Sequence, residues 1–487
     1  MKTKLFTLLL AALLLSTACG QAPAGETEPV SAETAGTADT AEEETALQDH
    51  LPDMDLEGYN YRMMVHGTDV HKADTYIEEL NGNLISDAVF NKITTVEDRF
   101  NVDVTLNEDN SADASSIETS KQSILAGDDA FDMIQGHDLN MVSGMLQNLF
   151  YNVYEVPYLD MTKPWWPAAT TESMTVGGQM YLMFNNISYR NLADVRIMFF
   201  NKELFTNNGI EFPYQQVYEG TWTMDAMLEI TENGYVDLNG NGERDLEDQY
   251  GFVHGNTFYG YMEPFKVEPY KKDKNGDLYY EFDLERISAL VEKSYALMFG
   301  AGGYFNGTET YVVTREKTFA QGTSLFYYDK FEAAVQNYSN TDILYGVVPM
   351  PKLDESQDSY YGGGTDRPIA IPITAAGNLE TVGIITEALN IEGYKQVFPA
   401  YFETARKSRY ADQTDDAAMI DIVHKNLIIS FTYLFGDYKS AYNCMFENLF
   451  RDTSTPGTDV ASWAAKKETE QVARVAVLQE FFAENRS

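Results

Sequence analysis

Strand-like and helix-like segments alternate over residues 59–149, and this alternation constrains the fold more than any other feature of the sequence. Residues 59–65 (YNYRMMV) alternate β-forming side chains, which predicts a strand. Apolar residues then recur at helical spacing at Ile85, Val89, Ile93, Val96 and Phe100. Further strands are predicted at 102–106 and 131–134, and further helices at 117–125 and 140–149. Alternating strands and helices form βαβ units, so we expect an α/β fold with a mainly parallel sheet.

Polar residues follow two of the predicted strands. His66 comes directly after residues 59–65, and His137 and Asp138 come shortly after residues 131–134. In open parallel sheets, ligands bind at the carboxyl ends of the strands. These three side chains are therefore predicted ligand contacts, and the alternative for the two histidines is an ordinary position in a surface loop.

The N-terminal region has the pattern of an export signal. Lys2 and Lys4 precede an apolar run at residues 5–15, and small residues then lead to Cys19. We interpret residues 1–18 as a signal peptide, and the segment resembles a bacterial lipobox, in which the cysteine is lipidated. A plain signal peptide is the alternative. Residues 19–50 contain acids but no Lys or Arg, so we expect a disordered acidic tether behind the anchor.

Length and charge limit the functions that the remaining chain can have. A chain of 487 residues is too long for one core, which predicts at least two lobes. The formal net charge of -41 argues against nucleic-acid binding, because that function needs a basic surface. The only cysteines are Cys19 and Cys444. We therefore expect no disulfide framework, and we interpret Cys444 as a small buried residue.

Residues 237–248 (DLNGNGERDLED) have the oxygen spacing of an EF-hand calcium loop. The predicted ligands are Asp237, Asn239, Asn241, the carbonyl of Glu243, Asp245 and Asp248. The segment also resembles the dockerin-type calcium loop and the single calcium loop of alginate-binding transport proteins. Asp248 stands where a bidentate Glu is usual, so a structural Ca²⁺ of weak affinity is expected. A polar turn without metal is the alternative.

Several short motifs follow one another along the rest of the chain. They are 156–166 (VPYLDMTKPWW), 200–205 (FNKELF), 209–213 (GIEFP), 221–224 (TWTM), 250–252 (YGF), 319–322 (FAQG), 345–351 (YGVVPMP) and 397–403 (VFPAYFE). In this order, behind a lipobox, they resemble the extracellular solute-binding proteins of ABC transporters. The resemblance is nearest to the carbohydrate-type (family 1) lipoproteins of Gram-positive bacteria.

The resemblance implies a two-lobe periplasmic-binding-protein-like fold with a hinge and a central ligand cleft. The chain would cross between lobes near residues 188–195, 367–371 and 426–431. Lobe 1 would comprise residues 51–190 and 367–428, and lobe 2 residues 191–366 and 429–487. The protein would be a monomer on the outer face of the cell membrane, attached only through its lipid. There it would capture a neutral sugar or oligosaccharide and deliver it to an ABC transporter permease.

A sugar site combines aromatic platforms with a few convergent polar groups. Trp165 and Trp166 are the predicted platforms, and an extended chain would point only one of them at the cleft. Tyr327 or Tyr328 would stack, Asp329 would accept hydroxyls and Arg367 would donate to ligand oxygens. Weaker aromatic candidates are Phe258, Tyr259, Tyr304 and Phe305. Trp222 and Trp463 are predicted to be structural.

No catalytic motif accompanies these features. The sequence lacks a Gly-x-Ser-x-Gly elbow, a His-Glu-x-x-His zinc motif and a phosphate-binding loop, so we expect no enzyme. An extracellular polysaccharide-degrading lipoprotein remains an alternative, because 75 acidic residues offer many carboxylate pairs. A binding lipoprotein that presents its ligand to a membrane sensor is a further alternative.

Overall fold

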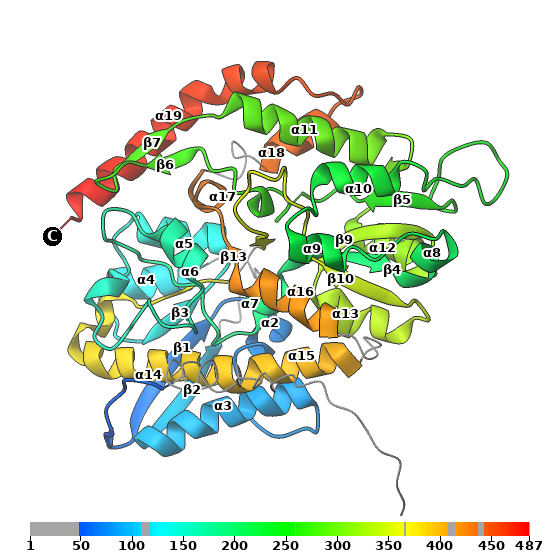
Figure 1. Ribbon diagram of the computed structural model, residues 1–487. Helices are drawn as coiled ribbons and strands as arrows, with labels where there is room; N and C mark the ends of the chain where they lie inside the picture. Colours follow the sequence, from blue (N-terminus) through cyan, green and yellow to red (C-terminus); the bar gives the residue numbers. More distant parts are fainter. Residues whose placement is uncertain are drawn as a thin grey trace, which may run out of the picture. The chain divides into compact units, whose positions relative to one another are not determined.

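The computed structural model describes residues 48–108, 117–258, 260–364, 367–407, 414–436 and 443–486 (Figure 1). In these ranges the strands form two main sheets, one of four strands and one of seven. Each sheet has its own large hydrophobic cluster. We call the four-stranded sheet with its cluster lobe 1, and the seven-stranded sheet with its cluster lobe 2. The prediction of a two-lobe α/β fold is confirmed. The predicted signal peptide, Cys19 and residues 20–47 lie outside the described residues.

Lobe 1 contains the alternating segments at the start of the chain. Its strands are β1 (Tyr59–Val65), β2 (Val102–Glu108), β3 (Met133–Gln135) and β12 (Ile369–Ala370). Its sheet has the order β12-β3-β1-β2, and β1 is parallel to both β2 and β3. The helices around it are α3 (Leu84–Phe100), α4 (Glu118–Ala126), α5 (Asp138–Met145), α6 (Ala168–Met174) and α14 (Leu379–Glu392). The predicted strands and helices over residues 59–149 are therefore confirmed, with shifted ends.

Helix α3 illustrates how the local sequence sets the element. The Asn83 side chain accepts hydrogen bonds from the Ile85 and Ser86 amides and caps the first turn. Asn101 ends the helix in the left-handed conformation, at φ 51°. The predicted apolar stripe is buried, and α14 packs beside the helix. Ile93, Val96 and Phe100 fix α3 against the core of lobe 1, whereas Ile85, at the start of the stripe, packs in the cluster of lobe 2.

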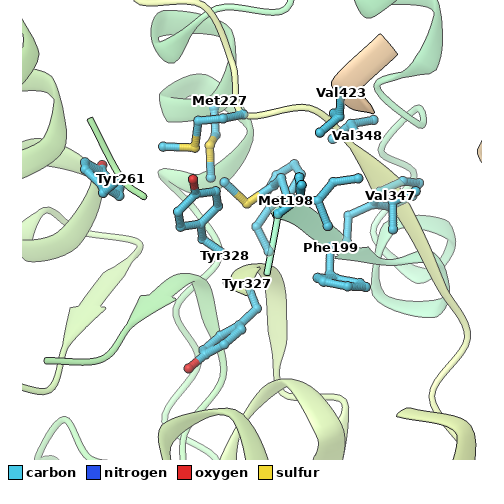
Figure 2. Close-up of a cluster of buried hydrophobic side chains, with 14 of the residues drawn as sticks. Met198, Phe199, Met227, Tyr261, Tyr327, Tyr328, Val347, Val348 and Val423 are labelled. Atoms are coloured by element: carbon cyan, nitrogen blue, oxygen red, sulfur yellow. The ribbon is translucent and has the colours of Figure 1, made fainter. Parts of the chain in front are cut away.

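Lobe 2 has the sheet order β13-β11-β4-β9-β5-β8, with β10 paired to β4. Its strands are β4 (Arg196–Asn201), β5 (Tyr250–His254), β8 (Gly303–Phe305), β9 (Ser324–Lys330), β10 (Tyr345–Val348), β11 (Gly362–Gly363) and β13 (Leu427–Ile428). Its helices include α8 (Lys202–Asn207), α9 (Tyr214–Glu219), α10 (Met224–Thr231), α11 (Leu284–Phe299), α12 (Tyr311–Lys317), α13 (Glu332–Gln336), α15 (Phe398–Lys407), α16 (Thr414–Lys425) and α18 (Asn443–Phe446). Figure 2 shows part of the hydrophobic cluster of this lobe.

The chain passes between the two hydrophobic clusters at three places that overlap the predicted crossing segments. Ile187 belongs to the cluster of lobe 1 and Leu192 to that of lobe 2, with α7 (Arg190–Ala193) between the sheets. Strand β11 lies in lobe 2 and β12 in lobe 1, so the second passage falls between Gly363 and Ile369. The third lies at Leu427 to Ile429, where the chain passes from lobe 2 to lobe 1, the reverse of the predicted direction. These segments are called the crossing region below.

The structure also has passages that the sequence did not reveal. A hairpin of β6 (Tyr270–Lys272) and β7 (Leu278–Tyr280) contributes Tyr270 and Leu278 to the cluster of lobe 1. Helix α14 packs in lobe 1, but residues 398–427 pack mainly in lobe 2, whereas the sequence placed 367–428 in lobe 1. Helix α17 (Phe431–Phe435) packs in lobe 1. An apolar stripe predicts a buried face but does not identify the core that buries it.

Helix α19 (Val460–Glu484) contributes to both clusters. Val460 and Trp463 pack in lobe 2, while Val475, Leu478, Phe481 and Phe482 pack in lobe 1. The helix runs along α11 and β7 (Figure 1). Trp222 and Cys444 are buried as predicted, and burial raises the pKa of the Cys444 thiol to about 11. None of the helices in the described ranges has the length and apolar composition that crossing a bilayer requires.

Candidate functional site

The carboxyl ends of β1 and β3 meet at one edge of the lobe 1 sheet. The His66 amide donates to the Gln135 carbonyl at 2.9 Å, and the His66 ring lies 2.6 Å from the Ser120 hydroxyl. The predicted ligand residue His66 is therefore buried. His137 is partly exposed, and its Nδ1 lies 2.8 Å from Oδ1 of the buried Asp138. The structure thus brings His66, His137 and Asp138 to the same edge, as expected from the topology.

Arg367 joins this edge from the second crossing segment. Its guanidinium donates to the His66 carbonyl at 2.6 Å and lies 3.3 Å from Nε2 of His71. A Cβ on Gly67 would stand 2.7 Å from the His71 ring, so glycine permits this close approach. Burial, together with the charges of Arg367 and Arg190, lowers the pKa of His71 to about 4. His71 is a member of the site that sequence reasoning missed.

A network of charged side chains connects the two lobes at the first crossing. Arg190 donates to Asp74, which caps α2 (Asp69–Ala73) in lobe 1, and to Glu332 at the start of α13 in lobe 2 at 2.9 Å. Lys330 of β9 donates to Asp194 at 2.6 Å. Burial raises the pKa of Asp74. Burial would also raise the pKa of Asp194, but the charges of Lys330 and Arg190 outweigh it, and that pKa is lowered.

Trp165 and Trp166 lie together in the core of lobe 1. Their exposed fractions are 0% and 2%, and their indole N–H groups donate to the two carboxyl oxygens of Glu387, at 2.7 and 3.0 Å. The expectation that the two rings point to different places is wrong, because this segment is a turn and not an extended strand. Burial raises the pKa of Glu387 to about 8, although both indole donors act to lower it.

Tyr327, Tyr328 and Asp329 have polar partners inside lobe 2. The Tyr327 hydroxyl donates to the Tyr311 carbonyl at 2.7 Å, and that of Tyr328 donates to the Gly260 carbonyl. Figure 2 shows the two rings pointing in different directions from β9. Asp329 accepts hydrogen bonds from Arg315 at 3.1 Å and from Tyr338 at 3.2 Å. All three residues are buried in this structure.

The predicted ligand residues thus lie in three places and not in one. His66, His137, Asp138 and Arg367 meet at the edge of the lobe 1 sheet, the tryptophans lie in the lobe 1 core, and Tyr327 to Asp329 lie in lobe 2. Among the weaker candidates, Phe258 stacks on Phe446 and Tyr304 on Tyr250, with ring centroids 5.4 and 4.7 Å apart. Phe305 packs against the lobe 2 core. Tyr259 lies outside the described residues.

The calcium-like loop is closed by a bridge between Val236 and Gln249. Asp237 accepts from the amides of Gly240 at 2.6 Å and Gly242 at 3.0 Å, and Gly242 has φ +76°. The side-chain amide nitrogens (Nδ2) of Asn239 and Asn241 donate to Oδ2 of Asp245, at 3.3 and 2.9 Å. Four of the predicted ligands are therefore held by one hydrogen-bonded loop.

Asp248 faces inward instead. It is fully buried and accepts from the Leu238 amide at 3.1 Å and the Tyr235 hydroxyl at 3.4 Å. Across the described ranges, no three His, Cys, Asp or Glu side chains converge as they do in a metal site. To coordinate an ion, the side-chain amides of the two asparagines would have to rotate, so that their oxygens take the places of their nitrogens. The donor set suits Ca²⁺.

Two buried charged residues beside the crossing region were not expected. Arg196 begins β4, and it pairs with Gly363 of β11 on one side and Lys330 of β9 on the other. Glu263 belongs to η2 (Glu263–Phe265), and its Cβ would lie 3.1 Å from a Cβ on Gly363. A charge inside the apolar run Val195-Arg-Ile-Met-Phe-Phe200 is a signal that could have identified Arg196.

The structure is similar to several solved binding proteins. A family 1 extracellular solute-binding protein from Bifidobacterium longum subsp. infantis aligns over 85% of this chain and 99% of its own, with 15% identity and a TM-score of 0.55. UspC from M. tuberculosis aligns over 85% and 100%, with 14% identity and a TM-score of 0.54. The galacto-N-biose-/lacto-N-biose I-binding protein of the Bifidobacterium longum ABC transporter aligns over 87% and 99%, with 13% identity and a TM-score of 0.53.

The chain has the fold of the extracellular solute-binding proteins. No protein-family model matches it, and no curated protein matches its sequence. The solute-binding-protein fold is thus recognised from the arrangement of the sheets, while the sequence has diverged from the similar structures.

Charged side chains gather at and beside the crossing region. Hinge movement of two lobes changes the environment of residues where the chain passes between them. Arg190, Asp194, Arg196, Lys330 and Arg367 all lie at or beside those passages. Four of these five residues were not singled out from the sequence.

Proposed function

We propose that the protein binds a carbohydrate between its two lobes and delivers it to an ABC transporter permease. The observation that supports this most strongly is the two-lobe fold, with separate cores joined by short crossing segments. The similar structures include a binding protein described in complex with lacto-N-biose. A polar crossing region, with several buried charges, offers directional hydrogen bonds to a ligand rich in hydroxyls. No bond needs to be made or broken in this function.

The location is part of the same proposal. Attachment of a lipid to Cys19 would hold the protein at the outer face of the membrane, and the acidic residues 20–50 would act as a tether. For delivery, the permease then needs only to distinguish the ligand-bound protein from the free protein, by a surface that the lobes present when ligand is bound.

A thermal-shift screen tests the binding function. We expect at least one neutral mono- or oligosaccharide, from a set that includes lacto-N-biose, to raise the unfolding midpoint, because ligand that binds only the native state stabilises it. The same sugar should make the protein more compact in solution scattering, since binding favours closed lobes. Free amino acids serve as the control set. A midpoint raised by amino acids alone, or turnover of a glycan without stable binding, would contradict the proposal.

We also propose that residues 237–248 bind a structural calcium ion. The support is the ligand spacing and the single hydrogen-bonded loop that holds Asp237, Asn239, Asn241 and Asp245. Asp248 is already fixed by the protein, so its carboxylate would join the ion only by leaving the Leu238 amide. This arrangement favours weak binding.

Calcium removal tests that loop. Extracellular sites bind with a dissociation constant of about 10⁻⁴–10⁻³ M, so roughly 10 mM calcium should stabilise the chelator-treated protein by about 1.4–2.7 kcal/mol. Asp237→Ala should abolish this gain. Glu247→Ala is the matched control, because it changes an acid of the same loop outside the predicted ligand positions. Equal midpoints of the wild-type protein with chelator and with calcium would refute the site.

A further inference from the structure

Glu263 is an unusual group beside the crossing region. Its exposed fraction is 3%, and neither carboxyl oxygen has a hydrogen-bond partner among the described residues. Buried polar atoms in folded proteins nearly always have such partners, because leaving them unsatisfied costs free energy. Burial, together with the charge of the nearby Glu268, raises the pKa of Glu263 to about 7, and the nearby amides of Glu263 and Met262 and the charge of Arg196 only partly offset this. An unsatisfied buried carboxylate of this kind therefore calls for an explanation.

Arg196 is the matching donor. Its exposed fraction is 5%, and none of the hydrogen bonds or ion pairs among the residues that the structure describes involves its guanidinium. It lies over the Tyr311 ring at 5.5 Å from the centroid. Lys330, directly opposite on β9, donates to Asp194 at 2.6 Å. The ammonium group of Lys330 therefore already has an acceptor, whereas the guanidinium of Arg196 does not. Arg196 therefore has its N–H donors available.

Glycines bring the two groups into one neighbourhood. Gly363 pairs with Arg196 on the adjacent strand, and a Cβ there would stand 2.4 Å from the Gly260 carbonyl and 3.1 Å from the Glu263 Cβ. A Cβ on Gly260 would stand 2.9 Å from the Arg196 side chain. Only residues without a side chain permit this approach of η2, β11 and β4. The carboxylate and the guanidinium are thus held beside the second crossing segment.

We infer that Glu263 and Arg196 form the polar centre of the ligand site and bind vicinal hydroxyl groups of an uncharged sugar. This inference rests on the proposed function. A hydroxyl group both donates and accepts, so adjacent hydroxyls can satisfy the carboxylate and the guanidinium together. The opposite charges offset one another, so a neutral ligand leaves no net charge buried. An acidic sugar would add an uncompensated negative charge beside Glu263.

Titration of three variants tests the inference, with lacto-N-biose, maltose and cellobiose as probes. Glu263→Gln and Arg196→Met should each weaken binding of the sugar that the wild type binds best by about tenfold to a hundredfold, the usual loss of a hydrogen bond to a charged group. Glu268→Gln is the matched control. Glu268 is a nearby acid whose pKa burial also raises to about 7, but its oxygens accept from Ser430 at 2.8 Å and from the Thr432 amide at 2.9 Å. The Glu268→Gln variant should bind the sugar with an affinity within about twofold of wild type. A structural acid whose hydrogen bonds are satisfied within the protein contributes little to the free energy of sugar binding.

Stability without sugar provides the second measurement. Glu263→Gln should unfold at the same midpoint as wild type or at a higher one, because it removes an unpartnered buried carboxylate. Glu268→Gln should unfold at a lower midpoint, because it breaks existing hydrogen bonds. Wild-type affinity in both site variants, or a lower midpoint for Glu263→Gln, would overturn the inference while leaving carbohydrate binding intact. If the wild type binds none of the three probes and no sugar of the wider screen, the proposed function fails, and the inference fails with it.

Discussion

Trp165→Ala is expected to lower the free energy of unfolding by about 3–5 kcal/mol, the usual cost of removing a fully buried tryptophan. The ring is 0% exposed, and its N–H donates to Glu387. Its backbone carbonyl also accepts from the Asn390 side chain at 3.0 Å. The variant therefore leaves a cavity and removes a donor from a buried carboxyl group. Urea unfolding followed by circular dichroism measures the change.

Trp165→Phe separates the two contributions. Phenylalanine fills most of the space but has no N–H, so its cost should be about 1–3 kcal/mol, that of one unsatisfied buried oxygen of Glu387. Sugar titration of the same variants tests the earlier prediction of ligand contact. If Trp165→Ala keeps the wild-type midpoint and loses sugar affinity, the ring faces ligand in solution and its packing against Glu387 is not the native state.

Arg190→Met should also cost about 3–5 kcal/mol, since it leaves buried acids without their cation. Asp74 is 1% exposed, and its described cationic partner is Arg190, which also reaches Glu332 at 2.9 Å. Methionine keeps the aliphatic stem of the side chain, so the decrease in the free energy of unfolding comes more from the lost charge than from the lost volume. Urea midpoints should fall while the slope of the transition stays unchanged.

A surface ion pair is the control for this prediction. Arg286 lies 3.0 Å from Asp354, and both side chains are partly exposed. Arg286→Met should change the free energy of unfolding by about 1 kcal/mol or less. If Arg190→Met is as mild as Arg286→Met, the Arg190 network is hydrated in solution and does not connect the lobes.

The first lobe could be predicted from the sequence because its signals are local. Helical spacing in α3, strand alternation in β1 and the βαβ rules each depend on nearby residues, and the structure confirms them. The crossing segments were also expected, from the resemblance. The destination of α15 and α16 was not, since Phe398 and Met419 would be buried by either core. Such long-range choices depend on shape complementarity between surfaces that no single segment encodes.

The candidate site was harder to predict than the fold. Trp165 and Trp166 were chosen because aromatic rings suit sugars, but a turn points both indoles at Glu387, which lies 221 residues farther along the chain from Trp166. Glu263 was hidden among 75 acidic residues. What distinguishes it is the lack of a partner, and that property exists only once the chain has folded.

Helix α19 has a consequence for the synthesis of the protein. Its first turn supplies Val460 and Trp463 to one core, and its later turns supply Val475, Leu478, Phe481 and Phe482 to the other. Neither core is complete before residues 460–482 have left the ribosome. A nascent chain therefore exposes apolar surface in both lobes throughout translation, and it stays open to chaperones until late. Under the export proposed above, this delay would keep the chain competent for transport.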